Sequence, residues 1–169
     1  MKKTIKIFFI IISLMSFNQA FACDLGLLPF GKEYKNILEK YKIETEIYDR
    51  KNFELNTRGQ KICSQLKNYQ VSFLFIDKKF SSIRIENLEK ANFKLYKIIA
   101  ENYGEPINKP NLASVDNSYA SYIDIEDYYI SYKNSLKDKH EMAIITPKKY
   151  LDKYSNYMQN LSEDKEKED

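Results

Sequence analysis

Residues 71–106, VSFLFIDKKFSSIRIENLEKANFKLYKIIAENYGEP, decide the fold of this chain. The segment 71–76 alternates two largely apolar sets of side chains, which predicts a strand lying inside a sheet. A polar turn at residues 77–79 follows. In the return strand Ile83 and Ile85 alternate with charged residues, which predicts a half-buried strand. The stretch therefore predicts a β-hairpin with one shared buried face.

The second part of the same stretch predicts an amphipathic helix. Asn87 is a suitable N-cap, Gly104 suits the left-handed position after the last turn, and Pro106 prevents the helix from continuing. Apolar residues fall on one stripe of this helix: Leu88, Ala91, Leu95, Ile98 and Ile99. We expect Leu95 and Ile98 to pack over the hairpin as core residues.

The rest of the chain repeats an order of helix and then strands. Before the hairpin, the pattern predicts a helix over residues 33–42, a strand over 43–48, a loop over 49–59 and a strand over 60–67. After it, the pattern predicts strands over 118–125, 128–133 and 141–145, then a helix that starts at Thr146-Pro147. The expected fold class is α+β, an antiparallel sheet or sheets with helices. Two tandem halves are suggested, closed by a C-terminal helix.

Residues 1–22 resemble a signal peptide. Three lysines precede a short apolar run, and Ala20-Phe21-Ala22 matches the small-residue cleavage pattern. The run is shorter than the roughly 20 residues of a membrane span, so no transmembrane segment is expected in the mature chain. Those lysines account for the whole formal charge of +3, which leaves no basic excess to suggest nucleic acid. We expect a periplasmic or secreted protein with one domain over 23–161 and a charged, disordered tail over 162–169.

Cys23 and Cys63 are the only cysteines of the chain. An even pair in an exported protein predicts one disulfide bond. The alternative is a lipid anchor at Cys23, because bacterial lipoproteins are acylated on a cysteine directly after the cleavage site. Ala20-Phe21-Ala22 is a poor match to that signal, and acylation would leave Cys63 as an unpaired thiol. The disulfide is the favoured interpretation.

The chain lacks the motifs that most enzymes require. His140 is the only histidine and is expected to be a solvent-exposed turn residue without metal-ligating partners. The sequence contains no glycine-rich phosphate loop, no G-x-S-x-G motif and no C-x-x-C pair, so no cofactor or metal site is predicted. Asp124, Glu126 and Asp127 form an acidic cluster, which is typical of a solvated β-turn. The same carboxylates allow a cation site or a glycosidase acid pair.

Tyrosines gather in the second hairpin: Tyr119, Tyr122, Tyr128, Tyr129 and Tyr132. Alternation directs Tyr122 and Tyr129 to the outer face of the sheet. Tyrosine is a good strand residue, and it also supplies the rigid contact area of protein-binding surfaces. Only the helix that follows Pro147 is available to cover this pair. If that helix packs there through Leu151, Tyr154 and Met158, the face is core and the pair is not a partner surface. If the helix packs elsewhere, we expect Tyr122 and Tyr129 to form a small partner-binding anchor.

Short motifs resemble those of small bacterial envelope proteins. They are Phe30-Gly31 before a short helix, the strand 71–77, Ile83-x-Ile85, and Tyr103-Gly104-Glu105-Pro106 after a helix. Some of those proteins share the fold of the BamE-type outer-membrane assembly lipoproteins and of the β-lactamase inhibitor proteins. The resemblance covers about half of the mature chain and implies an α+β fold. It assigns no functional residue.

These observations favour a non-catalytic, exported protein-binding module, either an envelope accessory factor or an inhibitor or immunity-type protein. One alternative is a cell-wall or glycan hydrolase that uses carboxylates such as Asp124 and Glu126. Another alternative is a structural envelope protein.

Overall fold

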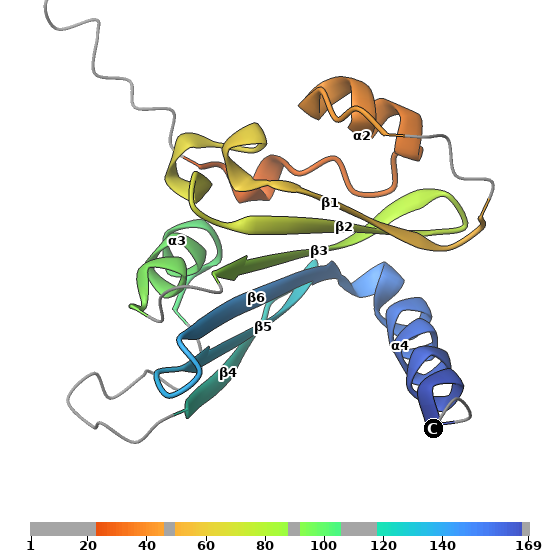
Figure 1. Cartoon of the computed structure of the whole chain (residues 1–169). Coiled ribbons are helices and arrows are strands. Elements are labelled where there is room, and N and C mark those ends of the chain that lie inside the picture. Colours follow the sequence, from red (N-terminus) through yellow and green to blue (C-terminus); the bar gives the residue numbers. More distant parts are fainter. Residues whose placement is uncertain (1–22, 46–49, 88–91, 106–117, 167–169) are drawn as a thin grey trace, which may run out of the picture.

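The computed structural model describes residues 23–45, 50–87, 92–105 and 118–166, and they form one antiparallel sheet with helices (Figure 1). The helices are α2 (Tyr34–Tyr41), α3 (Lys94–Tyr103) and α4 (Leu151–Glu166). The strands are β1 (Phe53–Arg58), β2 (Gln70–Ile76), β3 (Lys79–Asn87), β4 (Ser118–Asp124), β5 (Tyr128–Ser135) and β6 (His140–Pro147). Short 3₁₀ turns are η1 (Leu25–Leu27), η2 (Gly59–Lys61), η3 (Ser64–Leu66) and η4 (Lys148–Tyr150). The expected α+β class is confirmed.

The sheet consists of two three-stranded meanders that join at their last strands. The strand order is β1-β2-β3-β6-β5-β4, and every neighbouring pair is antiparallel. At the junction Ile83 of β3 lies opposite Ile145 of β6. Helix α2 precedes the first meander and α3 precedes the second, so the described elements follow the expected order of helix and then strands.

The core lies on the inner face of the sheet, under α2 and α3. Aromatic rings fill the first half, where Tyr41 stacks on Phe73 at 5.4 Å and Phe53 on Phe75 at 4.9 Å between ring centroids. In the second half the stripe of α3 is buried in the same cluster: Leu95, Ile98 and Ile99. The expectation that Leu95 and Ile98 are core residues is confirmed.

The connection between α2 and β2 differs from expectation. Strand β1 occupies residues expected to form a loop, because Phe53 and Leu55 face the core while the intervening Glu54 makes the segment look irregular. Residues expected as a strand over 60–67 form the turns η2 and η3 instead. Backbone N–H groups of Ile62 and Cys63 both donate to the Gly59 carbonyl, which closes these turns. Residues 43–45 form no strand, and 46–49 lie outside the described residues.

Helix α3 starts later than expected. Asn87 is the last residue of β3, buried opposite Glu141, and it is not a helix cap. Leu88 and Ala91 lie outside the described residues, and the helix begins at Lys94. The end is as expected: Gly104 follows the last turn with φ +89°, a value that favours glycine.

The closing helix also departs from expectation at both ends. Thr146 and Pro147 belong to β6, and η4 separates them from α4. Helix α4 then continues through Glu166, so residues 162–166 are helical where a disordered tail was expected. No helix among the described residues is long and apolar enough to cross a membrane.

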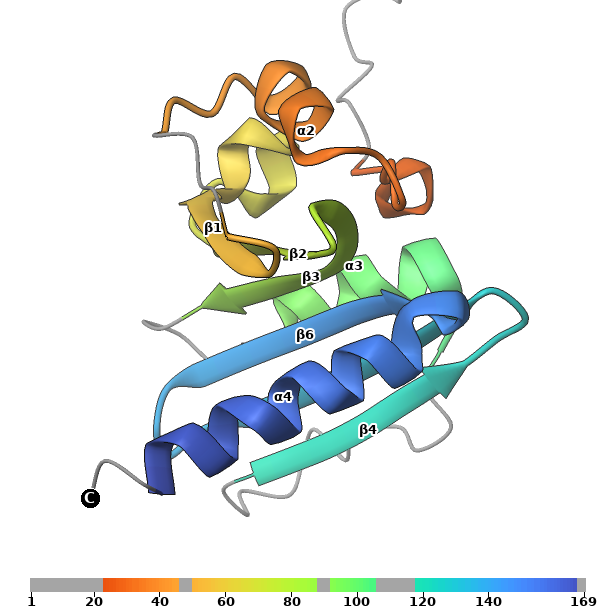
Figure 2. The ribbon, with the colours of Figure 1, turned by 90° about the vertical axis from the view of Figure 1, so that its right-hand side faces the viewer.

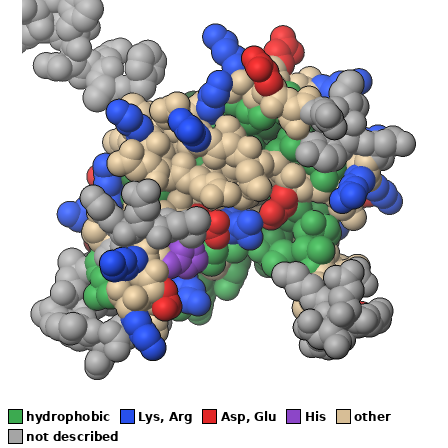
Figure 3. All heavy atoms as spheres, viewed as in Figure 1, with side chains coloured by type: hydrophobic (Ala, Val, Ile, Leu, Met, Phe, Trp, Pro, Cys, Tyr) green, Lys and Arg blue, Asp and Glu red, His purple; other side chains and the backbone are tan. Residues whose placement is uncertain are grey.

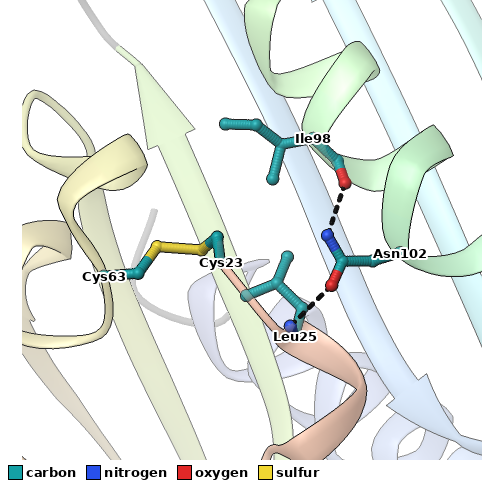
Figure 4. The surroundings of a disulfide bond; sticks show 5 residues. All are labelled: Cys23, Leu25, Cys63, Ile98 and Asn102. Carbon is teal, nitrogen blue, oxygen red and sulfur yellow. Dashed lines mark hydrogen bonds between the residues drawn. A yellow bond between two sulfur atoms is a disulfide. The ribbon is translucent and has the colours of Figure 1, made fainter. Parts of the chain in front are cut away.

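A disulfide joins Cys23 to Cys63, as expected, with the two Cα atoms 5.4 Å apart (Figure 4). The segment that follows Cys23 is also tied to α3. The Leu25 N–H donates to Asn102 Oδ1 at 2.7 Å, and the Tyr103 hydroxyl donates to the Leu25 carbonyl at 2.6 Å. A sulfur atom held in this bond cannot carry a lipid, and the bond fits a protein of an oxidising, non-cytoplasmic compartment.

Candidate functional site: the outer face of the second meander

Tyr122 and Tyr129 lie side by side on the outer face of the sheet. Their rings stack with centroids 5.8 Å apart and an angle of 21° between planes. Tyr122 of β4 is opposite Ser131 and Tyr129 of β5 is opposite Asp124, so the two tyrosines are diagonal neighbours, within reach for aromatic side chains. Tyr122 is 41% exposed and Tyr129 is half-buried. The sequence-based prediction of their common face is confirmed.

The inward set of the same hairpin is also as expected. Tyr132, Ile130 and Ile123 are buried in the core cluster, while Tyr119 and Tyr128 pack against it half-buried. The outward tyrosines, Tyr122 and Tyr129, therefore do not belong to the buried core. Stacking on each other covers part of their apolar surface, and Tyr122 keeps 41% of its surface exposed.

Helix α4 crosses this outer face but covers it incompletely (Figure 2). Leu151, Tyr154 and Tyr157 are half-buried, whereas Met158 is 39% and Leu161 is 40% exposed. The burial of Tyr154 raises its pKa. Hydrophobic side chains are visible between β6 and α4 in Figure 3. The face is thus neither closed core nor fully open surface.

Polar contacts at the tips of two hairpins hold the start of this helical segment. Lys148 Nζ lies 2.6 Å from Asp124 Oδ1, and the Lys148 N–H donates to the Asp127 carbonyl at 2.9 Å. At the other side Lys153 Nζ lies 2.8 Å from Asp77 Oδ2. Hydrogen bonds from Lys153 and Lys51 lower the pKa of Asp77 to about 2, so this carboxylate stays ionised and holds α4 to the first meander at neutral pH.

Asp124 and Glu126, the two carboxylates of the hydrolase hypothesis, lie in different surroundings. Glu126 and Asp127 line a cavity of about 500 Å³ beside Phe30 and Lys149, but Asp124 is not among the described residues of its wall. Asp124 is instead exposed and paired with Lys148. Asp124 and Asp127 thus both contact Lys148, the first residue of η4.

His140 is not an isolated turn residue. It is the first residue of β6, its side chain is 26% exposed, and its Nε2 lies 3.8 Å from Glu86 Oε1. Arg84 contacts the same carboxylate through Nε at 3.4 Å and reaches Glu54 at 3.1 Å through Nη2. A row of charges therefore crosses the outer face. The sequence does not reveal the whole row, because Glu54 and His140 come from strands β1 and β6, which are distant from β3 along the chain.

Glu141 is a buried carboxylate that the sequence analysis did not single out. Its Oε1 accepts hydrogen bonds from the Leu95 N–H at 3.0 Å, the Tyr96 N–H at 3.2 Å and the Tyr132 hydroxyl at 2.8 Å. Burial raises the pKa of Glu141, while these hydrogen bonds act in the opposite direction. The signal was present in the alternation of β6, since Glu141 shares its face with Ala143 and Ile145.

Within the described part of the chain, no group of three or more His, Cys, Asp and Glu side chains is placed to hold a metal ion. Comparison with known proteins adds no relative: no family model, no curated protein and no solved structure matches this chain. The resemblance to BamE-type lipoproteins and β-lactamase inhibitor proteins therefore stays a prediction.

Proposed function

We propose that this chain is an exported, non-catalytic protein-binding module, of the envelope accessory or inhibitor type, and that its partner protein contacts Tyr122 and Tyr129. One observation carries the proposal: a stacked tyrosine pair, with Tyr122 exposed and Tyr129 half-buried, on a sheet face that the closing helix covers only in part. The signal-peptide pattern of residues 1–22 and the Cys23–Cys63 disulfide support a periplasmic or secreted location.

The physical basis of the proposal is the free-energy cost of leaving the Tyr122 ring in contact with water. A partner that covers Tyr122 removes apolar area from water at about 25 cal/mol per Å². Both rings are already ordered by stacking, so binding loses little side-chain freedom. Tyrosines of this kind are common anchors, and truncating one anchor costs about 2 kcal/mol or more of binding free energy.

The test is crosslinking and pull-down of the mature protein from its native envelope. The double variant Tyr122→Ala with Tyr129→Ala is compared with wild type, and thermal melting checks its folding. Leu27→Ala is the matched control, because Leu27 is 72% exposed and lies in η1, which contacts α3 on the inner side of the sheet. We expect a partner that the wild type and the control recover and the double variant does not.

A second variant tests whether the partner is lost because the surface has changed or because the protein has unfolded. Tyr122→Glu places a charge at the more exposed ring position and leaves Tyr129 in place. It should retain the wild-type melting temperature and lose the same partner, since burying an unpaired charge at an interface is costly. Folded variants that recover every wild-type partner contradict the proposal.

A further inference from the structure

Among the described strands, β1 lies at one edge of the sheet and pairs with β2 on its other side. It is the uppermost strand of the sheet in Figure 1. Within the described part of the chain, Glu54, Asn56 and Arg58 form no backbone hydrogen bond outside the β1–β2 ladder. An edge strand of this kind presents unpaired N–H and C=O groups, which can pair with a further strand.

The hydrogen bonds at the end of the β1–β2 ladder show which residues of β1 carry those unpaired groups. The Gly59 N–H donates to the Tyr69 carbonyl at 2.7 Å, so this rung is a hydrogen-bonded one. Rungs of an antiparallel ladder alternate between hydrogen-bonded and non-hydrogen-bonded pairs. The alternation therefore directs the N–H and C=O groups of every second residue away from β2, at Glu54, Asn56 and Arg58.

The charges of these three residues make the strand its own complement. Their side chains lie on the outer face of the sheet, since Phe53 and Leu55 alternate with them and belong to the core. Glu54 is an anion, Asn56 is neutral and Arg58 is a cation. Antiparallel pairing of two copies of β1 about a two-fold axis at Asn56 places each Glu54 directly opposite Arg58 of the second copy.

Both charged side chains are available for this pairing. Arg58 is exposed and makes no ion pair within the described residues. Arg84 contacts Glu54 through Oε2 at 3.1 Å, which leaves Oε1 for a second cation. A shallow groove of about 690 Å³ is lined by Asn56, Thr57 and Arg58, so space is open beside the second half of the strand. Figure 3 shows a broad area of backbone and uncharged polar side chains (tan) over β1.

We infer that β1 pairs with β1 of a second copy of this chain, in a two-fold symmetric dimer whose sheet continues from one copy into the other. Opposite charges directly across an antiparallel ladder stabilise the pairing, and like charges oppose it. Charges on an edge strand discourage pairing with unrelated strands, so Glu54 and Arg58 also select a second copy over other strands. Tyr122 belongs to β4 at the opposite end of the strand order, so each copy keeps its tyrosine pair away from the dimer axis.

The experiment is sedimentation velocity of the mature, oxidised protein at concentrations from about 1 μM to about 500 μM. One short strand buries little surface, so we expect a monomer–dimer equilibrium with a Kd of about 1–100 μM. Protein that is monomeric at every concentration overturns the inference. Species that grow beyond a dimer also overturn it, because they indicate head-to-tail pairing of the two different edges of the sheet.

Charge reversal tests the register of the pairing. Arg58→Glu places two carboxylates opposite each other on both charged rungs, so it should weaken the dimer about tenfold or more. Glu54→Lys places two cations there and should weaken its own dimer to a similar extent. An equimolar mixture of the two variants restores an opposite-charge pair on each of these rungs. Heterodimers should therefore form in the mixture at the concentrations at which the wild type dimerises.

Lys137→Glu is the matched control, because Lys137 is exposed in the turn between β5 and β6 and its reversal changes the net charge equally. This variant should dimerise like the wild type. Thermal melting checks folding, above all that of Glu54→Lys, which loses the contact with Arg84. If Glu54→Lys does not fold, the result for Arg58→Glu decides. Wild-type dimerisation of folded Arg58→Glu overturns the inference, and so do two folded variants that stay monomeric when mixed.

Discussion

Glu141 caps helix α3 from a different part of the chain: its Oε1 lies 3.0 Å from the backbone nitrogen of Leu95. The residue that directly precedes the helix, Phe93, has a left-handed backbone and no capping side chain. A carboxylate near a helix N-terminus is stabilised by the free N–H groups and by the helix dipole. The Asn92 side chain accepts a hydrogen bond from the Lys94 N–H at 3.2 Å, and Glu141, which fastens α3 to the second meander, accepts the next two N–H groups of the helix.

Glu141→Ala should therefore be among the most destabilising single changes. It leaves the Leu95 N–H and the Tyr132 hydroxyl without their buried acceptor, with an expected loss of about 3 kcal/mol in the free energy of unfolding. Urea unfolding at neutral pH measures it. Glu163→Ala, in the exposed part of α4, is the control and should change stability by less than about 0.5 kcal/mol.

Glu141→Gln should change the pH dependence of stability. Because burial raises the pKa of Glu141 in the folded protein, the folded state binds the proton more tightly than the unfolded chain. The ordinary pKa of a glutamate side chain is about 4.5. As pH rises above this value, the free energy of unfolding of the wild type should fall, until the pH exceeds the pKa of Glu141 in the folded protein. The glutamine side chain of the variant does not titrate, so the difference between variant and wild type should move in favour of the variant as pH rises. If the difference in the free energy of unfolding between variant and wild type stays constant from about pH 4 to about pH 8, this prediction is contradicted.

Gly59→Ala should destabilise the β1–β2 connection. A Cβ atom at this position would overlap the backbone carbonyl of Leu66 and come within 2.7 Å of the Leu66 Cβ, so the turns η2 and η3 would have to move apart. Overpacking of this kind costs about 1–3 kcal/mol. Gly26→Ala, which meets only the flexible Asp24 side chain, should remain close to wild type in the same thermal melts.

Leu95→Ala removes a fully buried side chain of α3 and should cost about 2–5 kcal/mol. Lys97→Ala, an exposed position on the same helix, controls for helix propensity. Chemical denaturation of both variants provides the comparison. A loss for Leu95→Ala as small as that of Lys97→Ala would show that the buried face of the helix is assigned incorrectly.

Replacing both Cys23 and Cys63 by serine should lower stability by about 4 kcal/mol, the chain-entropy value for a closed loop of 40 residues. Non-reducing intact-mass analysis checks the premise, since the disulfide form lacks two hydrogens. An acylated Cys23 would appear as added lipid mass and would contradict the assigned bond.

The sequence predicted those parts of the fold that depend on local periodicity. The alternation of 71–76, the stripe of Leu95, Ile98 and Ile99, and the outward register of Tyr122 and Tyr129 all follow from side chains close together along the chain. Such patterns are set by the repeat of the strand or helix, which a sequence displays directly.

The remaining features depend on contacts between distant segments. The turns of η2 and η3 require the close approach of Gly59 to Leu66. The cap of α3 comes from Glu141, and the row of His140, Glu86 and Arg84 needs strands β3 and β6 side by side. Periodicity placed Glu141 on the inner face, but only the assembled sheet shows which helix it meets.

The order of the strands has a consequence for how the chain folds. Within each meander, neighbouring strands are consecutive along the chain, whereas the Ile83–Ile145 rung joins segments far apart. Closing that long loop is the entropically costly event of folding, because it brings together two three-stranded meanders that are far apart along the chain. Folding should therefore become cooperative only when β3 meets β6. Amides on either side of that seam should exchange with solvent most slowly, at the rate of global unfolding, and pulsed hydrogen exchange during refolding should protect them last.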